Sequence, residues 1–147
     1  MKIESPVFQD NEMIPARYTC DGEDVSPPLM FSGVPDGTRS LVMIVDDPDA
    51  PAGTWVHWTL WNIPPETRSI TEDSVPPGAV QGITSFGKSG WGGPCPPSGR
   101  HHYYFKLYAL DIEVELPPTC MAHDLHHAME GHILCQAQLI GLYRRSA

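Results

Sequence analysis

Basic residues are scarce in this chain, which has 9 Lys and Arg against 18 Asp and Glu and a formal net charge of -9. A surface of this sign repels nucleic acid and anionic membranes, so neither is expected as a partner. Any anion that the protein binds must therefore be held by a local site.

Long hydrophobic runs are also lacking. The longest, Leu41–Val45, is far too short to cross a bilayer. The first residues, Met1–Pro6, contain no apolar segment of the kind that directs export. We therefore expect a cytoplasmic protein without stable membrane anchoring.

Cysteine is infrequent, and its four positions (Cys20, Cys95, Cys120 and Cys135) include no CxxC pair. An even number permits disulfides. Without an export segment, and with a chain long enough to build a core, reduced thiols are favoured.

Proline and glycine are abundant, at 16 and 13 of the 147 residues. They interrupt the apolar segments at regular intervals, as turn residues do. The chain length fits one domain, and no repeat or linker divides it, so we expect a single domain over residues 1–147.

The segments between these turns have strand patterns. Ser40–Val45 resembles a fully buried strand, whereas Trp55–Ile63, Tyr103–Leu110 and Gln136–Tyr143 alternate. Strict alternation in Trp55–Ile63 places Val56, Trp58 and Leu60 on one face of the strand. The residues on the other face are Trp55, His57, Thr59 and Trp61. Weaker strand candidates are Val7–Phe8, Leu29–Phe31 and Gln81–Ile83.

One helix is expected late in the chain. Apolar and small residues recur at helical spacing from Met121 to His132, with Thr119 as a possible cap and Gly131 as a possible end. Strands without alternating helices favour an antiparallel arrangement. The predicted fold is thus mostly β, an antiparallel β-sandwich with one helix packed on a sheet.

A first polar loop follows the buried strand. Pro48 and Pro51 stiffen it, and we expect Asp46 and Asp49 to face solvent. Asp47 comes directly after the strand and is the best candidate to point inward. It is also an available partner for His57, which two tryptophans flank.

A second loop, Gly92–Arg100, leads into the strand at His101. Its glycines leave backbone N–H groups open to a ligand. His101 and Tyr103 lie two residues apart and share a face, away from His102. The alternative is a strand that merely ends in solvated histidines, but with Asp47 and His57 nearby a common site is favoured.

Several motifs together resemble the phosphatidylethanolamine-binding protein (PEBP) family, in particular its short bacterial and archaeal, Raf-kinase-inhibitor-like branch. They run in order from Ser5 to Arg145 and are Thr19–Gly22, Ser26–Leu29, Asp47–Pro51, Trp55–Trp58, Gly93–Gly99, His101–Tyr103 and Glu130–Leu134. The resemblance implies a β-sandwich with a small pocket for a phosphate or carboxylate. The pocket positions it implies are Asp47, Pro48, Trp55, His57, Gly93, Pro94, His101 and Tyr103.

The chain departs from the family pattern in two places. His102 stands where arginine is frequent, and the long C-terminal helix of eukaryotic members is lacking after Tyr143. The second departure makes the lipid and kinase functions of those members less transferable. Short members of the family often resemble dimers, so the resemblance also allows a homodimer.

These features favour a non-catalytic binding protein that holds a small anion, without a cofactor, and regulates a partner protein. Protonated His57 and His101 would donate to the anion, with Tyr103 and loop N–H groups, so binding should tighten as pH falls. One alternative is a protease or kinase inhibitor acting mainly by protein contact.

A second alternative is a weak hydrolase that uses Asp47, His57 and His101. No GxSxG motif supplies a nucleophile, and Cys95 is more typical of a spacer. His123 and His127 have helical metal-ligand spacing, but no HExxH is present and we expect no physiological metal.

Overall fold

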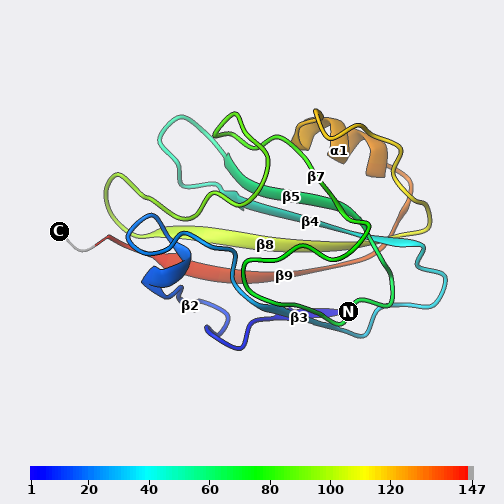
Figure 1. Ribbon diagram of the computed structural model, residues 1–147, viewed down its shortest axis with the longest axis horizontal. Helices are drawn as coiled ribbons and strands as arrows, with labels where there is room; N and C mark the ends of the chain where they lie inside the picture. The colour runs from blue at the N-terminus through cyan, green and yellow to red at the C-terminus, as the bar shows by residue number, and fades with distance from the viewer. Residues whose placement is uncertain (146–147) are drawn as a thin grey trace.

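Two β-sheets pack face to face in the computed structural model, which describes residues 1–145. The larger sheet has six strands in the order β2 (Glu12–Met13), β9 (Ile133–Tyr143), β8 (His101–Leu110), β4 (Ser40–Asp47), β5 (Trp55–Ile63) and β7 (Val80–Gln81). The smaller sheet contains β1 (Lys2–Glu4), β3 (Leu29–Ser32) and β6 (Ser69–Ile70). Figure 1 shows the four long strands running side by side through the centre of the molecule.

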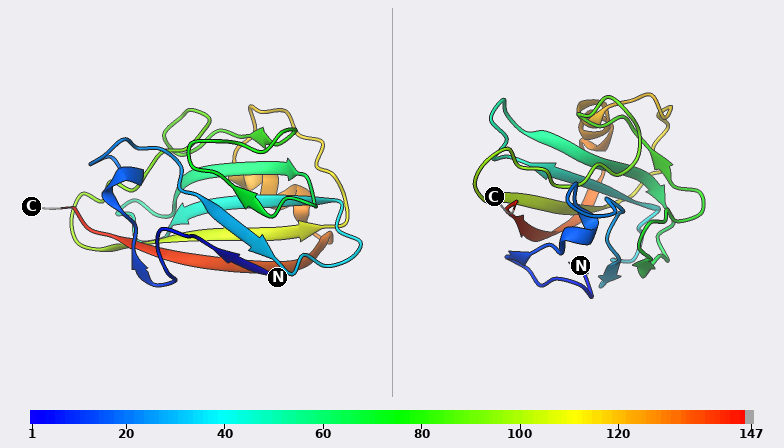
Figure 2. Two further views of the ribbon diagram at one scale, coloured as in Figure 1. Left: turned by 60° about the horizontal axis from the view of Figure 1, so that its bottom comes forward. Right: turned by 60° about the vertical axis from the view of Figure 1, so that its left-hand side comes forward.

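The helix and the smaller sheet lie on opposite faces of the larger sheet. In the left view of Figure 2, β3 is in front of the large sheet and α1 (Ala122–Met129) is behind it. Among the named strands of residues 1–145, all pairings are antiparallel except that of the short β2 with β9. The expected fold, mostly β with one late helix packed on a sheet, is confirmed.

The four long strands agree with the sequence pattern, and β4 extends two residues further to include Asp46 and Asp47. Leu29–Phe31 is also a strand, whereas in the segment Gln81–Ile83 only Gln81 belongs to a strand, β7, and Ile83 forms isolated bridges with Ser89 and Met121. The strand expected at Val7–Phe8 is wrong. Pro6, which lacks a backbone donor, precedes it, and Phe8 instead inserts its side chain into the core.

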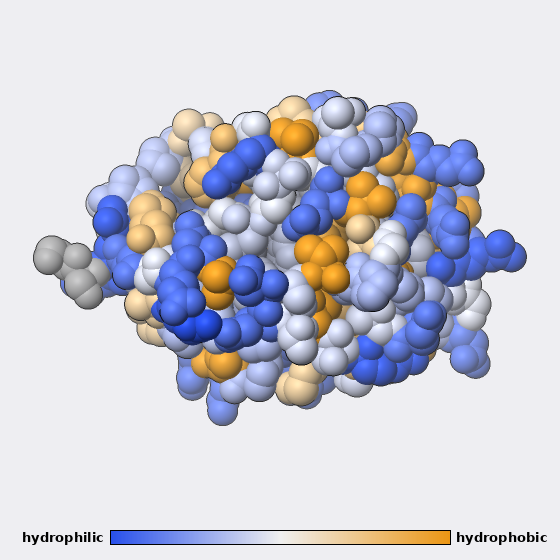
Figure 3. Space-filling model, viewed as in Figure 1, coloured by the Kyte–Doolittle hydropathy of each residue, from blue (hydrophilic) through white to orange (hydrophobic). Residues whose placement is uncertain are grey.

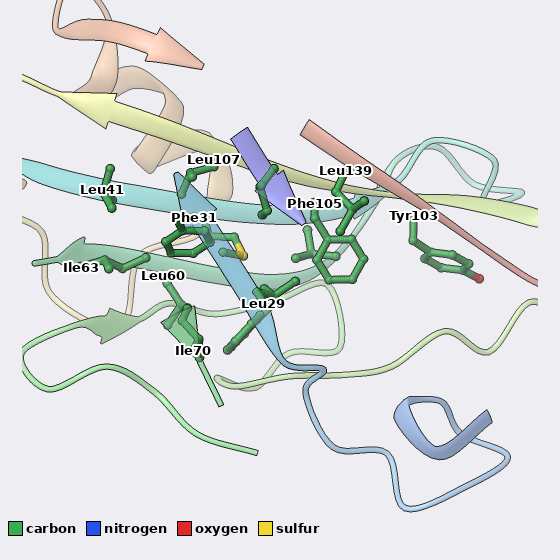
Figure 4. Packing of buried hydrophobic residues seen from close by; sticks show 14 of the residues in the cluster. Leu29, Phe31, Leu41, Leu60, Ile63, Ile70, Tyr103, Phe105, Leu107 and Leu139 are labelled. Carbon is green, nitrogen blue, oxygen red and sulfur yellow. The ribbon is translucent and has the colours of Figure 1, made fainter. Parts of the chain in front are cut away.

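The main core lies between the two sheets. Alternate residues of β8, namely Tyr103, Phe105 and Leu107, face this layer and contact residues of β3 and β4. Figure 4 shows Tyr103 at one end of the cluster, beyond Phe105 and Leu139. This face of the sheet is apolar along most of its length, and its polar residues lie at the Tyr103 end.

A second cluster lies between the large sheet and α1. It joins Val42, Ile44 and Trp61 to Leu125 and Met129 of the helix. The helix begins after Met121, whose N–H donates to the Asp124 carboxylate at 3.0 Å, so Asp124 and not Thr119 caps this end. Gly131, in the left-handed region at a φ of 79°, follows the helix as expected.

β5 carries a bulge at His57. Val45 pairs with Trp58, but the next residue of β4, Asp46, pairs with Val56, which leaves His57 as an extra residue. The strict alternation predicted for this strand is therefore wrong beyond His57. Trp58 and Leu60 face the inter-sheet core, on the same side as Asp47, and Trp61 faces the helix.

Candidate functional site

A cavity of about 200 Å³ opens at the end of the sandwich where β4 ends and where β5 and β8 begin. Antiparallel pairing of β4 with both neighbours brings these three strand ends together. The cavity is lined by Asp47, Ala50, Pro51, Trp55, His57, Phe86, Cys95, Pro96, Pro97, His101 and Tyr103. The two loops singled out in the sequence therefore do meet.

Asp47 and His101 form a buried pair at this cavity. His101 Nδ1 lies 2.7 Å from Asp47 Oδ2, and the two residues are 7% and 4% exposed. The second oxygen of Asp47 accepts the N–H of Asp49 at 2.8 Å. The carboxylate thus fixes the imidazole ring, and Nε2 is the ring nitrogen of His101 left to meet a ligand.

His57 is positioned by the second loop and not by Asp47, which corrects the expected pairing. Its Nδ1–H donates to the carbonyl oxygen of Gly92 at 2.6 Å. Burial lowers the pKa of the His57 imidazole, although the Gly92 carbonyl acts in the opposite direction. Burial therefore favours the neutral ring, with Nε2 as an acceptor, over the protonated His57 that we expected.

Tyr103 lies between the two histidines. Its ring contacts His57 edge-on at 5.2 Å between centroids and stacks with His101 at 6.4 Å. Tyr103 is 1% exposed, and within residues 1–145 its hydroxyl has no hydrogen-bond partner. Burial, with Asp47 as a second cause, raises the pKa of this phenol, which keeps it protonated.

An aromatic and proline wall completes the cavity. Phe86 contacts both Trp55 and His57 edge-on, with centroids 5.4 Å away in each case. It is 40% exposed, as expected for a residue at a cavity mouth. Sequence reasoning missed Phe86, because it lies in a turn between Ile83 and Lys88 with no periodic pattern.

Three of the residues expected in the pocket do not line it. Pro48 is exposed beside Asp47, and Gly93 and Pro94 are buried behind the wall. The Gly93 N–H donates to Asp24 Oδ1 at 2.8 Å, and the Gly92 N–H donates to the His57 carbonyl oxygen at 3.0 Å. These two amides hold the loop in place and are not available to an anion, contrary to expectation.

Cys20 and Cys95 form a disulfide, with their Cα atoms 5.5 Å apart. The expectation of reduced thiols is wrong for this pair, because the fold brings together two cysteines that are 75 residues apart. Cys120 and Cys135 are free. In this state Cys95 has no thiol to act as a nucleophile.

The other two acids of the first loop are also engaged. Asp46 does not face solvent as expected but is buried, with Oδ2 3.0 Å from Lys106 Nζ. Asp49 Oδ2 accepts from both the backbone N–H and Nδ1 of His102, at 2.8 and 2.7 Å. These hydrogen bonds from His102 lower the pKa of Asp49 and hold the first loop against β8.

The histidines of α1 lie elsewhere and are exposed. His123 lies near Asp124 and His127 near Glu130. Within the described part of the chain, no group of three or more His, Cys, Asp or Glu side chains is arranged to hold a metal.

The family model described as phosphatidylethanolamine-binding protein matches residues 4–144. The chain belongs to this family. A protein of Methanothermobacter thermautotrophicus named UPF0098 protein is 50% identical over 99% of both chains. Another from Aquifex aeolicus is 49% identical over 99% of this chain and 89% of its own length.

Two solved structures of PEBP proteins share the fold. A putative PEBP homolog from Chlamydia trachomatis is 39% identical, with a TM-score of 0.95 over 99% of this chain and 97% of its own. YbcL of E. coli, described as a member of the mammalian PEBP family, is 32% identical, with a TM-score of 0.92 over 99% and 98%. In residues 1–145, no helix has the length and apolar character needed to cross a membrane.

Proposed function

We propose that this PEBP family member binds a small anion of the phosphate type in the cavity, performs no chemistry on it, and uses occupancy to regulate a partner protein. The observation that carries the proposal is Tyr103, a residue of the cavity lining whose hydroxyl is buried and lacks a partner in residues 1–145. An unpaired buried polar group costs about 1–3 kcal/mol, a cost that a ligand oxygen would remove.

The charge balance favours a ligand that both accepts and donates. Protonated His101 would offset the charge of Asp47 and donate from Nε2, and Tyr103 would donate its hydroxyl. Neutral His57 has a lone pair at Nε2, so it needs a donor from the ligand. Inorganic phosphate keeps at least one P–OH group throughout the neutral range, because it loses its last proton only far above neutral pH, whereas a carboxylate or a sulfate has no such donor there.

The experiment is a pair of NMR titrations at pH 6.5, one with inorganic phosphate and one with sulfate. Phosphate should shift the His57 and His101 ring resonances in a saturable way, and sulfate should bind more weakly. Phosphate binding should also tighten as pH falls from about 7.5 to about 6, because an imidazole holds an anion best in its charged form. Unmoved ring resonances with phosphate would refute the proposal.

The absence of chemistry is part of the proposal. Among the residues that the structure describes, 1–145, no serine or threonine lines the cavity, Tyr103 is held in its protonated form, and the Cys95 sulfur is bonded to Cys20. Turnover on ester, phosphoester or peptide panels, abolished by His101→Gln, would instead establish the weak hydrolase considered above.

A protein partner, such as a kinase or a protease, and the cytoplasmic location remain proposals. The face in Figure 3 is mainly hydrophilic, with small separate apolar groups, so we expect contact to involve the cavity mouth, where Phe86 is exposed. Affinity capture with and without phosphate, using Tyr103→Phe as the matched bait, tests this. Capture that depends on neither phosphate nor Tyr103 would favour an inhibitor acting by surface contact alone.

A further inference from the structure

The disulfide joins the cavity wall to a distant part of the chain. Cys95 belongs to the wall together with Pro96 and Pro97, whereas Cys20 lies outside the cavity, just after the short helix η1 (Ala16–Tyr18). Both half-cystines are exposed. A soluble reductant can therefore reach the bond without unfolding of the protein.

Little else holds this part of the wall. The segment before it is well anchored, since the Trp91 indole donates to the Tyr18 carbonyl oxygen at 3.2 Å and the Cys20 N–H donates to the Pro94 carbonyl oxygen at 3.1 Å. Among the described residues, positions 95 to 100 make no hydrogen bond. Pro96 and Pro97 have no N–H to offer. The covalent link at Cys95, with the packing of the buried Pro96 next to it, thus holds this segment before β8 begins at His101.

We infer that the Cys20–Cys95 disulfide is a redox control of the cavity, whose wall is held in place when the bond is intact and is loosened when a dithiol reductant opens it. A thiolate of the reductant attacks one cystine sulfur and forms a mixed disulfide. Its second thiol then displaces the protein sulfur. Two protein thiols are formed and the reductant leaves as a disulfide, so two electrons and two protons are transferred.

The effect on binding follows from preorganisation. With the bond intact, Pro96 and Pro97 are held in place and a ligand has little to order. After reduction the wall from 95 to 100 must be ordered at each binding event, which lowers affinity without altering His57, His101 or Tyr103. This consequence rests on the proposed anion binding, but the change in wall mobility does not.

The experiment compares oxidised wild type, dithiothreitol-treated wild type and Cys20→Ser in two measurements. Cys20→Ser removes the bond without changing a cavity-lining residue, and Cys135→Ser, at a free cysteine of β9, is the matched control. Hydrogen–deuterium exchange over residues 92–102 should be faster in the two bond-free forms. The Kd for inorganic phosphate should rise at least about fivefold, the lower end of typical coupling between sites.

The outcomes separate the two proposals. Equal exchange and equal phosphate affinity in the oxidised and bond-free forms would overturn the redox control, as would a bond that dithiothreitol opens only in denaturant. If oxidised protein binds no phosphate, the proposed function fails, and the exchange measurement still decides whether the wall responds to reduction. Far-UV circular dichroism must match in all forms, and if Cys20→Ser does not fold, reduced wild type alone provides the comparison.

Discussion

Asp46 and Asp47 are neighbours in sequence but lie on opposite faces of β4, where Asp46 contacts Lys106 and Asp47 contacts His101. Successive side chains of a strand alternate between its faces, so one step along the chain moves from the helix side of the sheet to the cavity side. Both carboxylates are buried. Each therefore depends on the basic partner that β8 provides on its own side.

The Asp46–Lys106 pair should matter for stability. We expect Lys106→Met to lower the free energy of unfolding by about 2 kcal/mol or more, because it leaves a buried carboxylate without its partner; the partial exposure of Lys106 keeps the loss below that of a fully buried pair. Urea denaturation measures the change. Lys2→Met, which breaks the exposed Lys2–Glu4 pair, is the control and should change stability by less than about 1 kcal/mol. Similar losses in the two variants would contradict this expectation.

Tyr103→Phe should separate binding from stability. Removing a buried hydroxyl that has no partner in residues 1–145 should leave the free energy of unfolding unchanged or raise it by about 1 kcal/mol. Phosphate affinity should fall at least about tenfold, as expected for loss of a hydrogen bond to a charged group. Thermal denaturation and NMR titration on the same sample give both values. A destabilised variant with normal phosphate affinity would show that the hydroxyl has a purely structural role.

His57 should make stability depend on pH in a defined direction. Its folded-state pKa is lowered by burial, so the unfolded chain takes up the proton more readily. The contribution is fully present above the unfolded pKa of about 6.5 and is lost as pH falls below it. Unfolding free energies measured from pH 8 to pH 5 should therefore decrease toward low pH, and less steeply in His57→Asn.

A control for this pH experiment is His123→Asn, which removes an exposed histidine of α1. It should keep the wild-type slope. If His57→Asn and wild type show the same slope, His57 is not the group responsible.

The disulfide should also stabilise the fold. Cys20→Ser opens a link between residues 75 apart, and loss of such a link typically costs about 2–4 kcal/mol through the greater freedom of the unfolded chain. Chemical denaturation in the absence of reductant measures this loss. A change below about 1 kcal/mol would show that packing of η1 and the loop already fixes this region.

Much of the fold could be predicted because its signals are local. The continuous apolar pattern of Ser40–Val45 correctly predicted most of β4. The alternation in Tyr103–Leu110 correctly predicted most of β8. The shared face of His101 and Tyr103 followed from the same periodicity, and both residues line the cavity. Family motifs then indicated that two loops far apart in sequence would meet.

What could not be predicted depends on tertiary contacts. The partner of Asp47 is His101 and the partner of His57 is a backbone carbonyl, and neither choice is visible in spacing. The pairing of Cys20 with Cys95 depends on how η1 packs against the second loop. Phe86 joins the site only because its turn folds over Gly92, where a Cβ atom would clash with the Phe86 ring.

The bulge at His57 has a consequence for which changes of length the chain can tolerate. Deleting His57 alone would remove this bulge, because Trp58 and Val56, which already pair with Val45 and Asp46, would become adjacent; the second irregularity, between Leu41 and Met43, would remain. The sandwich would keep its register while the cavity lost one of its two imidazoles. Ala50 and Pro51 line the cavity, so insertions that spare the site are expected only after Pro51 and before Trp55, and not within the first three residues of β5.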